Sequence, residues 1–106
     1  MPMQIDISGH HYHVSDSTRT RIKAAVSRFE RFYTPVLGCH VTIKKEEPAF
    51  RVDIIVNVHG QTLKASNTGN KLFPVIDGSA KKMIRQLKKL RGRRRKPRVI
   101  SSLNEV

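Results

Sequence analysis

The stretch LFPVIDGSAKKMIRQLKKL, residues 72–90, decides the fold because its apolar residues recur at spacings of three and four. Such spacing aligns them along one side of a helix, where they can face a core. The aligned residues are Leu72, Ile76, Ala80, Met83, Ile84, Leu87 and Leu90. Pro74 fits the first helical turn, where its missing N–H has no partner to lose. Gly92 is predicted to end the helix.

Three alternating apolar runs precede this helix and predict three neighbouring strands. Their apolar positions are Val41 and Ile43, then Val52, Ile54, Val56 and Val58, then Leu63 and Ala65. The first connection, residues 46–49, contains Pro48, and the second is a tight turn in which Gly60 can take a positive φ. Residues 67–70 are predicted to form a loop. Because the intervening positions are mostly polar, with Ile55 as the exception, the far face of the sheet is expected to contact water.

The N-terminal third supplies one more strand and one more helix. Residues 3–7 alternate between apolar and polar, as in a strand with one buried side, and residues 8–15 are predicted to form a polar loop. Ser15 or Asp16 can cap a helix predicted over residues 16–33. Its apolar side consists of Ile22, Ala25, Val26, Phe29, Phe32 and Tyr33. The order of elements predicts an α+β fold, β-α-β-β-β-α, with a four-stranded sheet and two helices on one face.

A chain of 106 residues has room for one folded domain with one modest core. We expect the domain to cover residues 1–92, followed by a basic, flexible tail over residues 93–106, which begins RRRKPR and shows no periodicity. The single cysteine, Cys39, cannot form an internal disulfide. No apolar run approaches the roughly 18 residues that span a bilayer, and the first residues lack the features of a signal peptide. We therefore expect a cytoplasmic protein without a membrane partner.

The positive charge is large and unevenly placed. Lys and Arg number 21 against 8 Asp and Glu, which gives a formal charge of +13. Eleven of the 21 lie within residues 81–98, and residues 78–104 contain no acid. On the last helix these cations lie opposite the apolar side, where like charges three or four residues apart cost roughly 0.2–0.5 kcal/mol per pair. A face that serves only solubility usually mixes signs, so the pattern favours a polyanionic partner, nucleic acid.

The aromatic residues indicate which kind of nucleic-acid contact to expect. Proteins that read single strands stack bases on exposed aromatic rings. Most of the six aromatic residues here fall at core positions, and only Tyr12 and Phe73 are left unassigned. We therefore expect binding through phosphates and the shape of a folded RNA, with little reading of bases. The predicted RNA-binding residues are Lys23, Arg28, Arg31, Lys81, Lys82, Arg85, Lys88, Lys89, Arg91, Arg93, Arg94 and Arg95.

Three motifs give the chain a resemblance to a known family. They are GHHYHVSDS at 9–17, RFERFY at 28–33, and ID at 76–77 followed by KMIRQLKK at 82–89. In their order and spacing the chain resembles the ribosome hibernation promoting factor and ribosome-associated inhibitor family in its short form, over about residues 3–91.

The resemblance implies a domain like that of double-stranded-RNA-binding proteins, lodged between head and body of the small ribosomal subunit. There it would occupy the path of messenger and transfer RNA and inhibit translation without chemistry. Short forms can also favour paired ribosomes together with a second factor. By position, the resemblance makes Arg28, Arg31, Lys82, Arg85 and Lys89 the foremost RNA contacts.

The chain departs from the family pattern in several places. Ala24 and Ala25 stand where relatives commonly have lysine, which weakens one contact patch. Residues 68–70 replace a loop that is usually acidic, and Pro74 is unusual at the start of the last helix. We expect the C-terminal dimerisation domain of the long form to be absent.

No set of residues indicates catalysis or a cofactor. His10, His11 and His13 cluster without the cysteines or carboxylates that would complete a metal site, so none is predicted. Cys39 and His40 are strand neighbours that point to opposite faces, which favours a buried thiol over a nucleophile. No phosphate-binding glycine loop, GxSxG or HExxH motif occurs, and we expect no enzyme, cofactor or small-molecule substrate.

Two alternatives in function and two in location stay open at the level of sequence. The chain could be a general double-stranded-RNA binder without ribosome specificity, or a module whose basic face binds an acidic protein. The RRRKPR run would also suit a nuclear signal, and import into an organelle is not distinguished from a bacterial cytoplasm.

Overall fold

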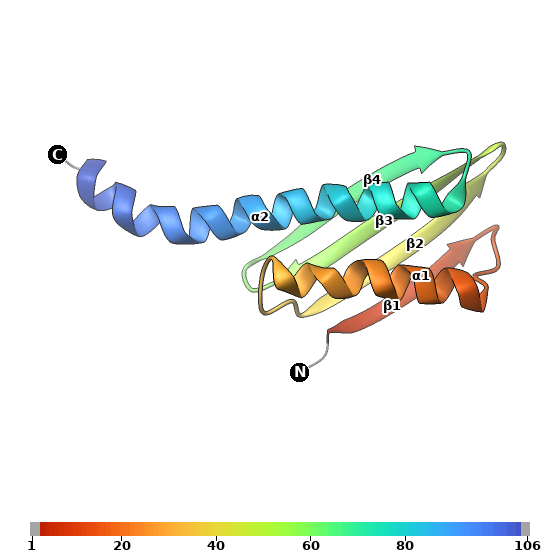
Figure 1. Cartoon of the computed structure of the whole chain (residues 1–106), viewed down its shortest axis with the longest axis horizontal. Coiled ribbons are helices and arrows are strands. Elements are labelled where there is room, and N and C mark those ends of the chain that lie inside the picture. Colours follow the sequence, from red (N-terminus) through yellow and green to blue (C-terminus); the bar gives the residue numbers. More distant parts are fainter. Residues whose placement is uncertain (1–2, 105–106) are drawn as a thin grey trace.

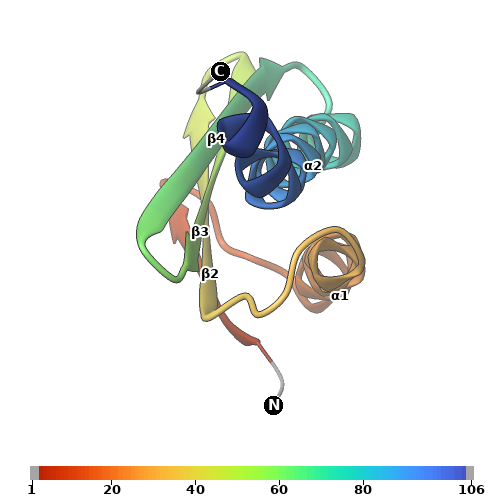
Figure 2. The same ribbon diagram turned by 90° about the vertical axis from the view of Figure 1, so that its left-hand side faces the viewer.

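The fold consists of a four-stranded sheet with two helices packed on one of its faces (Figures 1 and 2). The computed structural model describes the backbone of residues 3–104 and the side chains of residues 3–93. The strands are β1 (Gln4–His10), β2 (Gly38–Glu46), β3 (Ala49–Val58) and β4 (Gln61–Gly69). The helices are α1 (Asp16–Val26), a 3-10 turn η1 (Ser27–Arg31), and α2 (Leu72–Asn104). The predicted order β-α-β-β-β-α is confirmed.

The strands lie in the order β1-β2-β3-β4. β1 runs parallel to β2, with Ile7 opposite Val41, and the other two pairs are antiparallel, with Val41 opposite Ile54 and Ile54 opposite Ala65. The parallel pair requires a crossover, and α1 supplies it. The β3–β4 turn has Gly60 at φ 87°, as its sequence predicts.

The core lies between the helices and the alternating apolar residues of the sheet. From the sheet, Val41, Ile43, Val52 and Val56 are completely buried, and Ile22, Phe29, Met83 and Leu87 face them from the helices. Burial of such a side chain contributes about 1.5–3 kcal/mol. The core therefore fixes both helices on the sheet through the apolar stripes that the sequence predicts.

α1 begins at its cap and ends earlier than predicted. The Ser15 hydroxyl accepts a hydrogen bond from the Thr18 backbone N–H at 3.2 Å. The expectation of one α-helix over residues 16–33 is wrong beyond Val26, where the chain tightens into η1. The Ser27 hydroxyl donates to the Ala24 carbonyl at 3.0 Å, and such a bond bends a helix.

Both polar segments predicted as loops are partly strand. β1 continues to His10, where its residues still pair with β2, and β4 continues to Gly69, so the predicted loop at 67–70 is wrong. Pairing with a neighbouring strand overrides the weak strand propensity of polar residues. The Asn67 amide also donates to the Val75 carbonyl in the first turn of α2, at 3.3 Å, which ties the end of β4 to the helix.

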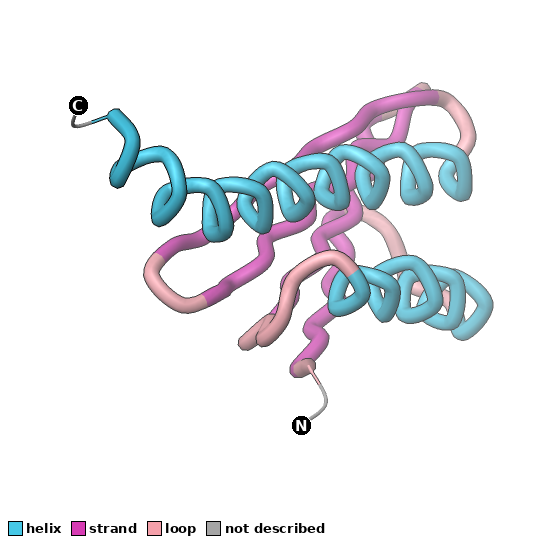
Figure 3. Tube along the Cα trace, turned by 60° about the vertical axis from the view of Figure 1, so that its left-hand side comes forward, coloured by secondary structure: helices cyan, strands magenta, loops and turns pink. Residues whose placement is uncertain are grey.

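α2 does not end at Gly92 but continues to Asn104, so that prediction is wrong. A glycine that ends a helix usually takes a positive φ, and among the described residues only His11 and Gly60 do so. Gly92 is an interior helical residue, and a Cβ added to it would meet no atom within 4 Å. As Figures 1 and 3 show, α2 extends beyond the sheet at its C-terminal end. The division into a domain over 1–92 and a flexible tail over 93–106 stays a prediction.

Candidate nucleic-acid interface

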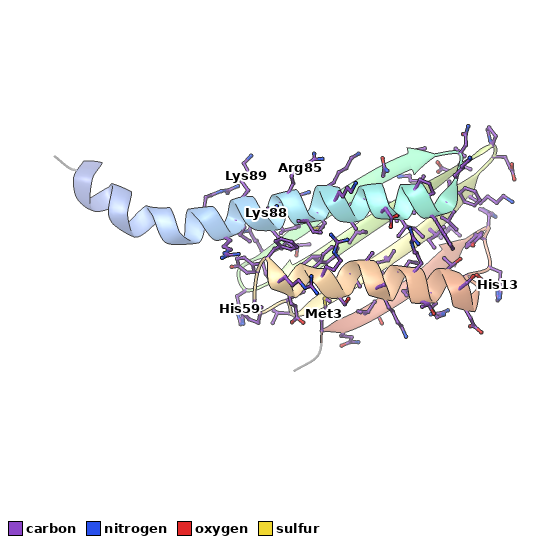
Figure 4. All side chains as sticks on the ribbon, in the orientation of Figure 1. Met3, His13, His59, Arg85, Lys88 and Lys89 are labelled. Carbon is purple, nitrogen blue, oxygen red and sulfur yellow. The ribbon has the colours of Figure 1, made fainter. Side chains whose placement is uncertain are left out.

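Most of the predicted RNA-binding side chains are exposed on the helix layer. We call this set the cationic face; it comprises Lys23, Arg28, Arg31, Lys81, Arg85, Lys88, Lys89, Arg91 and Arg93. Figure 4 shows Arg85 and Lys89 on the side of α2 turned away from α1, and Lys88 on the side toward it. The backbone of Arg94 and Arg95 belongs to α2, but their side chains lie outside the described ones.

Four of the seven acids in the described part of the chain lie in the sheet or its turn, and this placement contributes to the charge imbalance. In the described part of the chain, four of the five ion pairs belong to the sheet and its turn; they are Asp6–His40, Lys44–Asp53, Lys45–Glu47 and Arg51–Asp53. The open sheet face is thus balanced. The helix layer has one ion pair among these residues, Arg21–Asp77, so the cationic face keeps its charge.

Asp53 shows how the sheet face uses its acids. It accepts hydrogen bonds from the Ser66 hydroxyl at 2.5 Å and from Arg51 Nε at 3.1 Å, and Lys44 Nζ lies 3.7 Å away. Partial burial alone would raise the pKa of Asp53, but these two hydrogen bonds and the two positive charges lower it below its ordinary value. This carboxylate neutralises cations on the sheet rather than on the helices.

α1 and α2 lie side by side and run in the same direction (Figures 1 and 2), and residues of both helices line a groove. It encloses about 350 Å³, and we call it the helix groove. Its residues are Arg21, Ala24, Ala25, Arg28, Asp77, Ala80 and Lys81. The small side chains Ala24, Ala25 and Ala80 leave its floor open, while Arg28 and Lys81 place positive charge on its walls. Small side chains on both helices therefore give this groove room.

One ion pair crosses the helix groove. Arg21 donates to Asp77 at 2.6 Å, and the guanidinium carbon lies 5.1 Å from the centre of the Phe73 ring. The hydrogen bond that Arg21 donates to Asp77, and then the negative charge of Asp77, raise the pKa of Arg21. Sequence reasoning did not identify this group, although Asp77 is the last acid before the acid-free segment.

Lys82 is exposed, as predicted, but its ammonium group is directed at the sheet. It donates to the Ser66 carbonyl at 2.9 Å and to the Asn67 side-chain oxygen at 3.4 Å. One turn later the Gln86 amide donates to the Lys64 carbonyl at 2.6 Å. Both acceptor carbonyls belong to the edge strand β4. Lys82 therefore differs from Arg85 and Lys89 in having protein acceptors.

A second aromatic lies beside the cationic face. The Lys88 ammonium is 5.2 Å from the centre of the half-buried Phe32 ring, and these two residues line a hollow of about 340 Å³ together with Arg91 and Gly92. A cation over an aromatic face gains about 0.5–1 kcal/mol at an exposed site. Phe32 thus anchors Lys88 near the end of η1.

The remaining candidates form no metal site in the part of the chain that is described. No group of three potential metal ligands occurs there, and His10, His11 and His13 form none. Cys39 is 3% exposed, and burial raises its thiol pKa to about 12, which agrees with the expected buried thiol. None of the helices, within the residues described, is apolar over enough length to cross a membrane.

The fold and its charges define a class: small α+β proteins in which two parallel helices cover one sheet face and present unpaired cations. Within this class, the sequence profile of the Sigma 54 modulation protein / S30EA ribosomal protein family matches residues 5–95. The chain belongs to this family.

Individual relatives agree with the assignment. The Ribosome hibernation promoting factor of Klebsiella oxytoca is 30% identical over 87 residues, which cover 82% of this chain and 92% of the relative. The protein of the same name from Escherichia coli (strain K12) is 28% identical over the same coverage.

Two solved structures share the fold. The Thermus thermophilus Protein Y N-terminal domain superposes with a TM-score of 0.76 at 18% identity, and a ribosomal subunit interface protein from Coxiella burnetii superposes with 0.77 at 20% identity. Each comparison covers 85% of this chain and 99% of the other. The predicted fold and family are confirmed.

Proposed function

We propose that this protein binds the small ribosomal subunit through its cationic face and keeps the ribosome inactive by occupying the channel of messenger and transfer RNA. The observation that carries the proposal is the separation of charge: Asp6, Glu47 and Asp53 pair with basic residues of the sheet, while no described lysine or arginine of α2 belongs to an ion pair. Relatives named Ribosome hibernation promoting factor support it. The protein acts by occupancy and not as an enzyme.

Phosphates of ribosomal RNA are the ligands that fit this face. Lys and Arg side chains that neutralise phosphates release counter-ions from the nucleic acid, so affinity falls linearly on a log–log scale of salt. Contact with about six to eight phosphates gives a slope of roughly −4 to −7, at 0.7–0.9 per phosphate. A slope shallower than about −2 would contradict the proposal.

Sedimentation through a sucrose gradient tests the partner. The protein should migrate with small subunits, and Arg85→Glu/Lys89→Glu should release it, because both side chains are exposed and turned away from α1. The single variant Arg85→Glu should weaken binding in part. Its control is Lys64→Glu, the same charge reversal on the exposed side of the sheet, which should bind like the wild type. Retention of the double variant at the wild-type level would overturn the proposed interface.

Two treatments, competition with free RNA duplex and digestion with nuclease, distinguish the proposed function from its alternatives. A general double-stranded-RNA binder should leave the subunits when free RNA duplex is added in excess. Under the proposed function, this protein should remain bound to the subunits. A module for an acidic protein should stay with its partner after nuclease treatment. The proposed function predicts release, because nuclease removes the ligand phosphates.

If the protein occupies the RNA channel, it must compete with messenger and transfer RNA, which binding elsewhere on the subunit does not require. Messenger RNA and transfer RNA bound beforehand should prevent binding of the protein to small subunits, and the protein should inhibit translation in a purified system. Binding that is unaffected by both RNAs would place the protein outside the channel.

A further inference from the structure

Phe73 is an exposed aromatic residue on the helix layer. It lies in the first turn of α2 and is 38% exposed, while Phe29 is completely buried and Phe32 and Phe50 pack against the core. Among the described residues, the other large hydrophobic side chain with comparable exposure is Leu37, which precedes β2. The position of Phe73 is therefore not explained by the core.

Arg21 makes this ring part of a larger group. Its guanidinium carbon lies 5.1 Å from the ring centre, so a planar cation lies over the aromatic face. The bond to Asp77 at 2.6 Å holds the guanidinium in place. An arginine that is already held loses less side-chain entropy when a ligand binds. Aromatic rings and guanidinium planes are the two surfaces on which proteins stack unpaired RNA bases.

The helix groove begins at the same arginine. Its volume of about 350 Å³ lies within the range of small ligand sites, roughly 300–1,000 Å³. Phe73 and Lys81 are eight residues apart on α2, which corresponds to about 12 Å along the helix. An RNA strand that continues along α2 from a base at Phe73 passes Asp77 and reaches Arg28 and Lys81.

We propose that Phe73 and Arg21 form a stacking site for one unpaired RNA base, and that Arg28 and Lys81 bind the phosphates that follow it in the helix groove. The proposal rests on the proposed function and deepens it, because it assigns part of the RNA ligand as single-stranded. It also revises the expectation that bases play little part. The bound base extends the Arg21–Phe73 stack by one ring, and such stacking is tolerant of base identity.

Substitutions at Phe73 separate stacking from charge. Phe73→Leu keeps an apolar side chain but removes the aromatic face, and Phe73→Tyr keeps the face. Phe73→Leu should weaken binding to small subunits at least fivefold, the lower end of what stacking of one base supplies, with an unchanged salt slope. Phe73→Tyr should bind like the wild type. Lys81→Ala should instead make the slope shallower by about 0.7–0.9.

A short single-stranded RNA with one 2-aminopurine reports stacking directly, because stacking changes the fluorescence of this base. The wild type and Phe73→Tyr should quench it, and Phe73→Leu should not. Leu37→Ala, which removes an exposed apolar side chain outside the helix groove, is the control and should behave like the wild type.

Unchanged subunit affinity and unchanged quenching with Phe73→Leu would overturn the stacking site while leaving the proposed function intact. If the wild type itself fails to bind small subunits, the proposed function fails. The fluorescent RNA then still decides whether Phe73 stacks a base.

Discussion

Lys82 Nζ donates a hydrogen bond to the backbone oxygen of Ser66 at 2.9 Å, which joins the exposed side of α2 to the edge strand β4. An unpaired edge exposes carbonyls and amides to other chains, and proteins protect such edges with charged side chains. Lys82 therefore has a structural function that its position in a basic run conceals.

Lys82→Met, which keeps the aliphatic chain and removes the ammonium, should lower the free energy of unfolding by about 0.5–1 kcal/mol. Urea denaturation measures this effect. Arg85→Met should leave stability unchanged within about 0.5 kcal/mol and should weaken subunit binding, with a salt slope shallower by about 0.7–0.9. The opposite result, a stable Lys82→Met that binds poorly, would make Lys82 an RNA contact.

Gly78 and Gly92 should respond in opposite directions to replacement by alanine. A Cβ at Gly78 would collide with the Asn67 amide, which also bonds to Val75, whereas a Cβ at Gly92 would meet no atom within 4 Å. Gly78→Ala should lose about 1 kcal/mol or more. Gly92→Ala should gain roughly 0.5–1 kcal/mol, because alanine favours the helix. Thermal unfolding of both variants checks the pair, and stabilisation by Gly78→Ala would show that Asn67 yields freely.

Asp53 should make stability depend on acid. Its folded pKa is lower than the unfolded value near 3.8, so its contribution is fully present above that value and is lost as the pH falls through the folded pKa. Unfolding free energies measured from pH 6 to pH 2 should fall in this window for the wild type. Asp53→Asn should show a smaller fall; an equal fall would assign the effect to other carboxylates.

Cys39 should be unreactive in the folded protein. Its thiol pKa of about 12 keeps the thiolate scarce at pH 8, and the side chain is buried. Alkylation by iodoacetamide should be at least about a hundredfold slower than in urea, because only the unfolded thiol ionises readily. Because the folded pKa of Cys39 is raised, its contribution to the free energy of unfolding is fully present below the unfolded pKa. This contribution is lost as the pH rises toward 12. Equal rates in both solvents would contradict the burial.

Asp77→Asn should strengthen binding to small subunits. The amide keeps a partner near Arg21 but removes the acid from the helix groove, so the salt slope should become steeper by up to about 0.9. Asp6→Asn, which changes an acid paired with His40 on the sheet face, should have no such effect. Weaker binding of Asp77→Asn would mean that the fixed position of Arg21 matters more than the charge of Asp77.

The sequence predicts those parts of the fold that burial decides. The stripe from Ile76 to Leu87 and the alternation from Val52 to Val58 each require a particular periodicity, because a shift by one residue would expose the core. The helix layer and the order of elements follow from these stripes. The cations opposite the stripe are exposed for the same reason.

The remaining features depend on contacts between distant segments. Asn67 is polar, yet it lies in β4 because β3 and α2 supply its partners. The direction of the Lys82 side chain depends on where β4 passes, and periodicity carries no such information. The Arg21–Asp77 bridge likewise joins residues 56 positions apart, so no local pattern could identify the helix groove.

Because α1 and α2 run in the same direction, their peptide dipoles also point in the same direction. The partial positive charges of both helix starts, near Asp16 and Leu72, therefore lie together at one end of the helix layer. That end has fewer lysines and arginines than the part of α2 after Lys81. Under the proposed function, RNA would meet backbone amides at one end of the layer and side-chain charges at the other.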